Sequence, residues 1–200
     1  MLLKDKVAII TGGAGLNGLG FAAARMMAAQ GAKVAILDLA GANPQAAATA
    51  LGEGHIGLVA DVTDKASCEA AVAQVKQRYG RIDVLLNNAG THANGPFEAA
   101  SDEIWQQDFD LKLFSAIRLA RAALPGMKAR KWGRIINTAS AHSLVASPFK
   151  AAYVTAKHGV AGLSKTVALE VATFGITSNC ISPGYVWTPL VEKQIPDTMK

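Results

Sequence analysis

The feature that most constrains the fold is a glycine-rich loop, TGGAGLNGLG, set between an apolar run and a helical pattern near the amino terminus. The apolar run covers residues 6–11, and the helical pattern runs from Leu19 to Gln30. An acid, Asp38, follows Gly18 by 20 positions, at the end of a second apolar run. Strand, glycine loop, helix and distant acid together are typical of a dinucleotide-binding βαβ unit, in which glycines let the backbone approach a pyrophosphate. The sequence therefore predicts a dinucleotide site at this loop.

The glycine loop can be aligned in two ways, and the sequence leaves the choice open. One alignment uses the general G-x-G-x-x-G form, and the other a longer loop that opens with Thr-Gly and closes with Gly-x-Gly. The first takes in Gly13, Gly15 and Gly18, and the second takes in Gly12, Gly18 and Gly20.

Two acids after successive strands bear on how a dinucleotide is held. A carboxylate at Asp38 is suited to accept hydrogen bonds from both ribose hydroxyls and to repel a 2′-phosphate, and no Lys or Arg follows it closely. The sequence therefore favours NAD over NADP. Asp61, after the third expected strand, either hydrogen-bonds the adenine or simply caps a helix.

The rest of the chain alternates strand and helix patterns, which predicts a parallel sheet with helices on both faces. Half of the residues are hydrophobic and only 18% are charged, so we expect a substantial core. We expect residues 1–200 to form a single α/β domain, a three-layer doubly wound parallel sheet of the Rossmann type. Further strands are expected at 33–37, 55–60, 82–86, 133–138 and 176–181, and further helices at 43–51, 64–79, 102–128 and 151–174, with Pro125 kinking or ending the third of these.

Charge, cysteine and histidine patterns argue against several classes of protein. The formal net charge is +5, but its densest group, at residues 128–134, is interpreted as a solvated helix end rather than a nucleic-acid patch. The two cysteines form no CxxC and the four histidines show no metal-ligand spacing, so we expect neither a metal site nor a disulfide. With no signal-peptide pattern and no apolar run of membrane-spanning length, we expect a cytoplasmic protein.

A second feature, the stretch 137–157, carries a pattern suited to acid–base chemistry on alcohols and carbonyls. Tyr153 and Lys157 are four residues apart, so on a helix they share a face. An ammonium beside a phenol favours the phenolate and lowers the tyrosine pKa. Ser140, 13 positions before the tyrosine, is expected to hold an oxygen against the tyrosine hydroxyl. The Tyr-x-x-x-Lys spacing is weak by itself, and its value comes from the dinucleotide fingerprint that precedes it.

With these pieces in order, the chain resembles the short-chain dehydrogenase/reductase family from end to end. The matching motifs are TG…GxG, DV after the third strand, NNAG after the fourth, the serine, YxxxK and a late PG. The resemblance implies that Tyr153 is the acid/base, that Lys157 binds the nicotinamide ribose and lowers the tyrosine pKa, and that Ser140 orients the substrate oxygen. Besides Tyr153, Lys157 and Asp38, the cofactor-binding residues expected are Gly12, Gly18, Gly20, Asp61, Val62, Asn88, Ala89, Gly90, Pro183 and Thr188.

The chain departs from the family pattern at two places near the site and at its end. The family's fourth catalytic residue is an asparagine that helps hold a water in a proton relay, and here that position is Lys112. Lys112 either extends toward that water or points to solvent. The glycine loop is also two residues longer than usual. Because the family continues with another helix and strand, we expect the C-terminal part to be missing or truncated and residues 185–200 to begin a substrate lid.

Within the family, the segments IINTASAHSLVASPFKAAYVTAKHGVAGLSK and PGYVWTPLVEKQIP are similar to 3-hydroxybutyrate dehydrogenases of the bacterial type. That resemblance implies that His142, Lys150 and Gln194 bind the substrate carboxylate. For Lys150 the same role is expected independently of the resemblance, since a lysine three positions before the catalytic tyrosine can present an ammonium to an anionic substrate. The alternatives are a polar loop residue at His142 and a solvated cation at Lys150. His92 and Tyr185 replace a glutamine and a tryptophan of the subgroup, and we expect both to bind substrate.

We therefore expect an NAD-dependent oxidoreductase that interconverts a short hydroxy acid and its keto acid, with (R)-3-hydroxybutyrate and acetoacetate as the favoured pair. The alternatives are action on another secondary alcohol or a 3-oxoacyl thioester, and a catalytically impaired dinucleotide-binding protein. Small residues on the helices 102–128 and 151–174 suit the helix-pair contact common in the family. We expect a homo-oligomer, a dimer or tetramer, with neither nucleic acid nor membrane as partner.

Overall fold

Six parallel strands form the central sheet of the computed structural model, which describes residues 1–91 and 95–192. The strand order is β3-β2-β1-β4-β5-β6, so the order reverses between β1 and β4. Ligands of such sheets bind beyond the carboxyl ends of the strands at this reversal. The strands are β1 (Val7–Thr11), β2 (Lys33–Asp38), β3 (Ile56–Val59), β4 (Val84–Asn87), β5 (Gly133–Thr138) and β6 (Ile176–Ile181).

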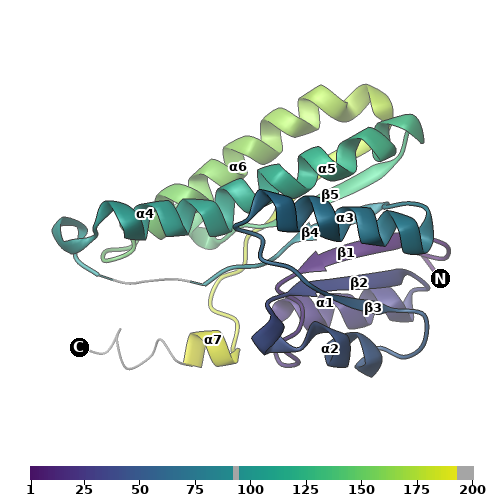
Figure 1. Cartoon of the computed structure of the whole chain (residues 1–200). Helices are drawn as coiled ribbons and strands as arrows, with labels where there is room; N and C mark the ends of the chain where they lie inside the picture. The colour runs from purple at the N-terminus through teal and green to yellow at the C-terminus, as the bar shows by residue number, and fades with distance from the viewer. Residues whose placement is uncertain (92–94, 193–200) are drawn as a thin grey trace.

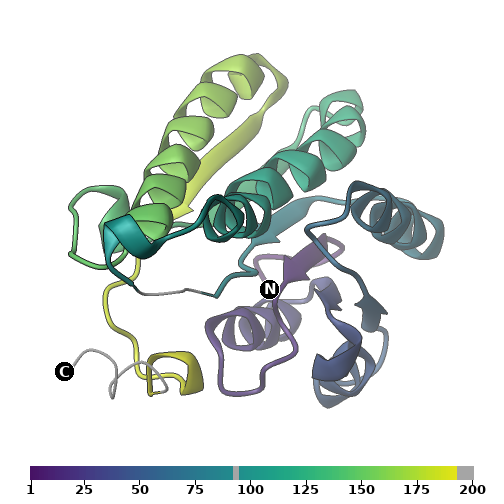
Figure 2. The same cartoon turned by 60° about the vertical axis from the view of Figure 1, so that its left-hand side comes forward.

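Helices cover both faces of the sheet, as Figures 1 and 2 show. One face carries α1 and α2. The other carries α3, α6 and a continuous helical rod made of α4, a π-helical turn and α5, called the α4–α5 rod. This arrangement confirms the predicted doubly wound α/β fold. The helices are α1 (Leu19–Ala29), α2 (Pro44–Ala50), α3 (Lys65–Tyr79), α4 (Asp102–Phe109), α5 (Ser115–Ala129), α6 (Ala151–Val171) and α7 (Pro189–Glu192).

The central strands are buried on both faces because helices cover both. Every residue of β1 and β4 is buried, and the four middle residues of β2 are buried as well. Such strands have near-continuous apolar sequences, which is what VAIIT and KVAILD provide. The β5 strand instead alternates buried and half-buried positions, and its bounds match the expected ones.

The helix expected at 102–128 differs from the prediction in two ways. Its hydrogen-bonding pattern is interrupted after α4 by a π-helical turn at Asp110–Phe114, after which α5 continues the rod. The rod also runs past Pro125 to Ala129, so an end at Pro125 is wrong. Pro125 lies on the exposed side of α5, where the carbonyl that loses its partner can face water.

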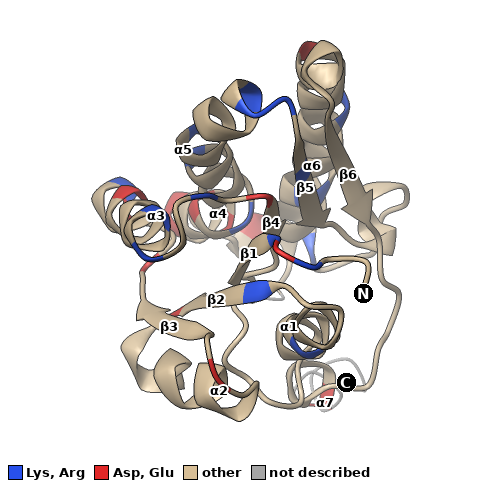
Figure 3. Cartoon of the chain, turned by 90° about the vertical axis from the view of Figure 1, so that its right-hand side faces the viewer, with Lys and Arg blue, Asp and Glu red and all other residues tan. Residues whose placement is uncertain are grey.

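The basic group at 128–134 lies at the amino-terminal edge of the sheet, where two of its members hydrogen-bond to backbone. Arg130 donates to the Ile82 carbonyl at 2.5 Å, and Arg134 donates to the Gly175 carbonyl at 3.0 Å. The interpretation as a simply solvated helix end was therefore wrong for these two residues. Lys and Arg elsewhere are spread over helices, strands and loops rather than gathered on one face (Figure 3).

Candidate active site

A pocket of about 580 Å³ opens at the carboxyl ends of the strands. Its walls come from the glycine loop, the segment after β4, the stretch from β5 into α6, and the chain after β6. The topology thus brings together most of the residues singled out in the sequence. Those lining the pocket are Gly12, Gly18, Gly20, Asn88, Gly90, Lys112, Ser140, His142, Lys150, Tyr153, Lys157, Pro183, Tyr185 and Thr188.

The glycine loop is closed by contacts that leave no room for a side chain. Gly12 has a φ of +63°, and a Cβ there would lie 2.7 Å from Ala89 Cα. A Cβ on Gly20 would lie 2.5 Å from the Gly12 carbonyl oxygen, whereas one on Gly15 would meet nothing within 4 Å. Gly12 and Gly20 are therefore the positions that require glycine, which favours the longer of the two alignments. The loop brings backbone and the amino terminus of α1 to the pocket, a cradle that fits a pyrophosphate.

Asp38 lies at the end of β2, as expected, and organises the glycine loop. Its Oδ2 accepts a hydrogen bond from the Ala14 N–H at 2.9 Å, and its Oδ1 accepts one from the Leu39 N–H at 2.9 Å. Among the residues that the structure describes, Asp38, Asp61, Val62 and Ala89 do not line the pocket. Asp38 and Ala89 instead hydrogen-bond to Ala14 and Thr11 beside the pocket, and Val62 is part of the core.

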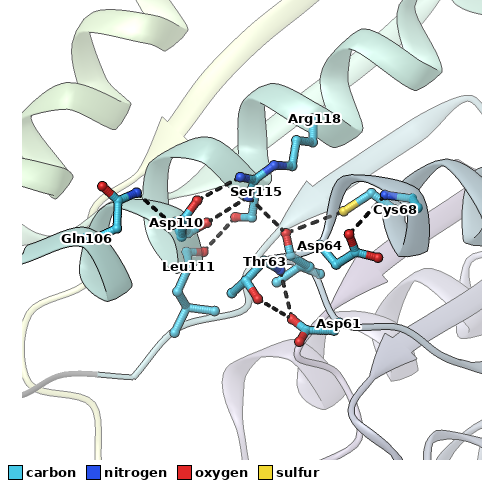
Figure 4. A network of polar contacts seen from close by, with 11 residues as sticks. Asp61, Thr63, Asp64, Cys68, Gln106, Asp110, Leu111, Ser115 and Arg118 are labelled. Carbon is cyan, nitrogen blue, oxygen red and sulfur yellow. Dashed lines mark hydrogen bonds and ion pairs between the residues drawn. The ribbon is translucent and has the colours of Figure 1, made fainter. Parts of the chain in front are cut away.

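The Asp61 carboxylate does not cap α3. Its Oδ1 accepts hydrogen bonds from the Thr63 N–H at 2.8 Å and from the Thr63 hydroxyl at 2.7 Å (Figure 4). The cap of α3 is Asp64, which accepts from two N–H groups of the first turn. The helix-cap alternative for Asp61 is therefore wrong, and its use at the adenine stays a prediction.

The segment after β4 joins three strand ends through one side chain. Asn88 Nδ2 donates to the carbonyls of Thr11 and Gly12, at 3.1 and 3.0 Å. Its Oδ1 accepts from the Thr138 hydroxyl at 3.4 Å, at the end of β5. Thr11 Oγ1 in turn accepts from the Ala89 N–H at 3.0 Å. This network fixes the floor of the pocket at the reversal of strand order.

Ser140 lies just past β5 and starts a short 3₁₀ turn, Ala141–Ser143. Its hydroxyl accepts from the His142 N–H at 3.2 Å and also hydrogen-bonds to Tyr153. The His142 ring stands nearly perpendicular to the Tyr153 ring, with 6.0 Å between centroids. Serine, tyrosine and histidine therefore meet in one corner of the pocket, as the prediction for Ser140 required.

Tyr153 and Lys157 share one face of α6, as their spacing predicts. The Lys157 ammonium donates to the Thr138 carbonyl at 2.5 Å and lies 5.8 Å from the Tyr153 ring centroid. Burial, helped by repulsion from Lys112, lowers the pKa of Lys157 to about 8.

The pKa of Tyr153 itself is raised above its ordinary value, chiefly by burial, while the Ser140 hydrogen bond lowers it. The expected lowering of the tyrosine pKa by the lysine is thus not seen in the protein alone. Because Lys157 loses its proton near pH 8, little ammonium remains there when the phenol ionises.

Lys112 is buried and does not point to solvent. Its ammonium pairs with Asp108 Oδ1 at 2.5 Å and lies 5.5 Å from the Tyr153 ring centroid. Asp108 is a residue that the sequence analysis missed. The signal that could have found it is the i, i+4 spacing of Asp108 and Lys112 on an expected helix.

At the mouth of the pocket, Lys150 and Tyr185 lie together. Lys150 is 7% exposed, which rules out a freely solvated cation, and its ammonium donates to the Tyr185 hydroxyl at 3.5 Å. Burial and repulsion from Lys150 lower the pKa of His142. His142, Lys150 and Tyr185 thus line the same pocket, whereas His92 and Gln194 lie outside the described residues.

Residues 183–192 form the remaining wall. The Pro183 carbonyl accepts from the Ala141 N–H at 2.9 Å, which ties this segment to the 3₁₀ turn after Ser140. Thr188 precedes α7, and its hydroxyl accepts from the Val191 N–H at 3.3 Å. This short helix was not expected, although a Thr-Pro pair is a typical helix start.

Residues 1–91 and 95–192 contain neither a metal-binding cluster nor a membrane-spanning helix. No group of three His, Cys, Asp or Glu side chains there is placed to hold a metal ion, and both cysteines are free. None of the helices in that part of the chain is long and apolar enough to cross a bilayer.

Comparisons with known proteins agree with this geometry. Residues 6–198 match the short chain dehydrogenase family model. A D-beta-hydroxybutyrate dehydrogenase of Rhizobium meliloti is 48% identical over 96% of this chain and 76% of its own length, and one of Cupriavidus necator is 42% identical over 97% and 76%. A crystal structure of levodione reductase superposes with a TM-score of 0.93 at 34% identity, covering 98% of this chain and 78% of that one. The chain belongs to the short-chain dehydrogenase/reductase family, whose members are oxidoreductases that use a nicotinamide dinucleotide.

Proposed function

We propose that this protein is an NAD-dependent oxidoreductase that interconverts a short hydroxy acid and its keto acid, with (R)-3-hydroxybutyrate and acetoacetate as the favoured pair. The observation that carries the proposal is the buried Lys150 ammonium in the same pocket as Tyr153. The names of two relatives, at 48% and 42% identity, support the same substrate class.

The proposed chemistry divides between the bound cofactor and the chain's own residues. When bound, the nicotinamide ring would supply the hydride acceptor for oxidation of the alcohol. Tyr153 removes the hydroxyl proton, and Ser140, hydrogen-bonded to Tyr153, orients the substrate oxygen toward it. Lys157, on the same helix face, would hydrogen-bond the nicotinamide ribose, and while it keeps its proton its charge favours ionisation of the tyrosine.

The other end of the pocket supports recognition of a carboxylate. The Lys150 ammonium supplies the charge, and its contact with the Tyr185 hydroxyl gives that ammonium a fixed direction. His142 is close to both Lys150 and Tyr153, since its ring contacts the tyrosine ring and repulsion from Lys150 helps to lower its pKa. A molecule with a carboxylate and a nearby hydroxyl could contact Lys150 with the carboxylate and Tyr153 with the hydroxyl. Gln194 and His92 are proposed as further substrate ligands from sequence alone.

NAD rather than NADP is proposed because of Asp38. The Asp38 carboxylate lies at the end of β2 and holds the Ala14 N–H of the glycine loop. A 2′-phosphate on the adenosine ribose would be placed against this negative charge, whereas two free hydroxyls could donate to it.

A second candidate is reduction of a bulkier ketone or a 3-oxoacyl thioester. A putative ketoacyl reductase of Streptomyces virginiae is 41% identical over 94% of this chain, and levodione reductase shares the fold. Large apolar side chains also stand exposed within three residues, along the chain, of pocket-lining His142 and Thr188, at Leu144, Val145 and Trp187. They would suit a longer apolar substrate.

A panel of substrates decides between these functions. Initial rates of NADH formation are measured for (R)- and (S)-3-hydroxybutyrate, a neutral secondary alcohol and a 3-hydroxyacyl thioester, each with NAD and with NADP. We expect the highest kcat/KM for (R)-3-hydroxybutyrate with NAD. A higher value for the neutral alcohol or the thioester would overturn the proposed substrate class.

A homo-oligomer is also proposed, formed through the α4–α5 and α6 faces. Leu169 of α6 is 82% exposed, which leaves apolar surface for a second copy to cover.

A further inference from the structure

A buried ion pair lies behind the proposed catalytic residues. Asp108 of α4 and Lys112 of the π-helical turn are 5% and 4% exposed, and no atom of the lysine side chain beyond the backbone reaches solvent. One carboxylate oxygen, Asp108 Oδ1, bonds the ammonium, while Oδ2 is buried without a hydrogen bond from the described residues. The pair thus uses only part of its hydrogen-bonding capacity.

Such a pair contributes little to stability, because the cost of removing two charges from water offsets their attraction. Apolar side chains of similar size at the same positions are often as stable or more so. Stability therefore does not explain why two charges are placed here, whereas their surroundings suggest a functional reason.

Side chains from neighbouring helical turns hydrogen-bond to the turn Asp110–Phe114, which carries Lys112 (Figure 4). The Asp110 carboxylate accepts from Arg118 at 2.7 Å and from the Gln106 amide at 2.7 Å. The Ser115 hydroxyl donates to the Leu111 carbonyl at 2.6 Å within the widened turn. Single π turns inside α-helices are frequent at functional sites, and this one directs Lys112 into the pocket wall.

Lys112 faces the two proposed catalytic residues of α6. Its ammonium lies 5.5 Å from the Tyr153 ring centroid, and the Lys157 ammonium lies 5.8 Å from the same centroid. Two ammonium groups therefore lie within 6 Å of the centre of one phenol ring, and one of them is paired with a carboxylate. The titratable groups that act on this cluster are Tyr153 and Lys157 of α6, Cys180 of β6, and Tyr185 beyond β6.

We propose that Asp108 is a positioning residue of the catalytic site, which holds a charged Lys112 ammonium beside Lys157 so that Lys112 controls when Lys157 carries its proton. The inference rests on the proposed use of Tyr153 and Lys157 in catalysis. Without Asp108, burial would drive Lys112 to its neutral form, since burial already lowers the pKa of Lys112 and Asp108 opposes that effect.

The consequence for the site is that Lys157 exchanges its proton near neutral pH instead of remaining a permanent cation. Repulsion by Lys112 is the second cause, after burial, of the lowered pKa of Lys157, about 8. A group with a pKa near the working pH is suited to pass protons on. An asparagine at position 112, as in the family pattern, would lack this repulsion.

The test removes both charges together, so that neither is left alone in the core. Asp108→Leu/Lys112→Met is an apolar pair of similar size, and Asp108→Asn/Lys112→Gln is a neutral pair that can keep a hydrogen bond. Either one decides the question if the other fails to fold. Thermal unfolding is measured for both, together with an NMR titration of ¹³C-labelled lysine side chains in the cofactor-free protein, with Lys157→Arg assigning the Lys157 signal.

We expect the double variants to unfold near the wild-type temperature. The Lys157 midpoint should rise by about half a pH unit or more from its wild-type value, because losing the repulsion from Lys112 outweighs losing the weaker attraction from Asp108. The alkaline limb of kcat/KM should move upward by the same amount. If stability is retained and the Lys157 midpoint stays within a few tenths of a unit, the pair is only structural and the inference is wrong. A wild-type Lys157 that titrates like an ordinary lysine would also overturn it.

This test is separate from the test of the proposed function. The lysine titration needs no substrate, so it can fail while 3-hydroxybutyrate is oxidised, and it can succeed while another alcohol proves to be the substrate.

Discussion

Lys150 and Tyr185 hold each other at the mouth of the pocket, with the lysine ammonium 3.5 Å from the tyrosine hydroxyl. They come from segments 35 residues apart, one just before α6 and one after β6. Two chain segments therefore meet at a buried ammonium in the pocket wall, and the first prediction follows from that charge.

Lys150→Met should raise the KM for 3-hydroxybutyrate about ten- to a hundredfold, the value of a hydrogen bond to a charged group. The KM for a neutral secondary alcohol should change little, because it has no carboxylate to lose. Initial rates with both substrates measure this, and Lys165→Met, which changes an exposed lysine of α6, is the matched control. Equal KM values for 3-hydroxybutyrate in the wild type and in Lys150→Met would show that Lys150 does not bind the carboxylate.

Asp38→Asn should weaken the preference for NAD over NADP by about tenfold or more, because the like-charge repulsion of the 2′-phosphate disappears. The asparagine Oδ1 can still accept the Ala14 N–H bond that the carboxylate accepts at 2.9 Å, so the loop should keep its shape. The measurement is kcat/KM with each cofactor. A wild-type protein that prefers NADP would contradict this use of Asp38.

Gly20→Ala should destabilise the protein by about 1–3 kcal/mol, the usual cost of overpacking. Its new methyl group would lie 2.5 Å from the Gly12 carbonyl oxygen. Gly15→Ala is the control, since its methyl group would meet nothing within 4 Å, and its effect should stay within about 0.5 kcal/mol. Urea unfolding compares the two variants, and equal stabilities would mean that the loop is not closed as described.

Stability should decline as the pH falls below about 6.5, the ordinary histidine pKa, in part because of His55. His55 Nδ1 accepts the Val34 N–H at 3.1 Å, and burial followed by repulsion from Lys33 lowers the His55 pKa. A lowered pKa in the folded state means that the unfolded chain binds the proton first, so the contribution is complete above the ordinary pKa and is lost below it. His55→Asn should reduce the slope of unfolding free energy against pH in this range; an unchanged slope would assign the acid sensitivity to other groups.

Much of the framework was predictable because the signals are local. Glycine at 133 and 175 and the proline at 183 bound the last two strands, and the expected ranges 133–138 and 176–181 match β5 and β6. The pairing of Tyr153 with Lys157 follows from helix geometry alone, and the structure has both on α6.

The interruption of the long helix was not predictable in the same way. The spacing of apolar residues does not predict a π turn at Asp110–Phe114. The turn coincides with the buried ion pair of Asp108 and Lys112 and with a second ion pair, between Arg118 and Asp110. The direction of the Tyr153 pKa shift was also not predictable from the sequence, because it depends on burial and on whether Lys157 keeps its proton. Sequence spacing gives neither quantity.

The role of Tyr153 is the centre of this account, and Tyr153→Phe tests it most directly. The measurement is the initial rate of NADH formation from (R)-3-hydroxybutyrate, with NADH binding followed by fluorescence to show that the cofactor site is intact. We predict a loss of about a thousandfold in kcat, within the range for a lost acid–base group, and nearly unchanged NADH binding. A Tyr153→Phe protein that retains most of the wild-type rate would contradict the account.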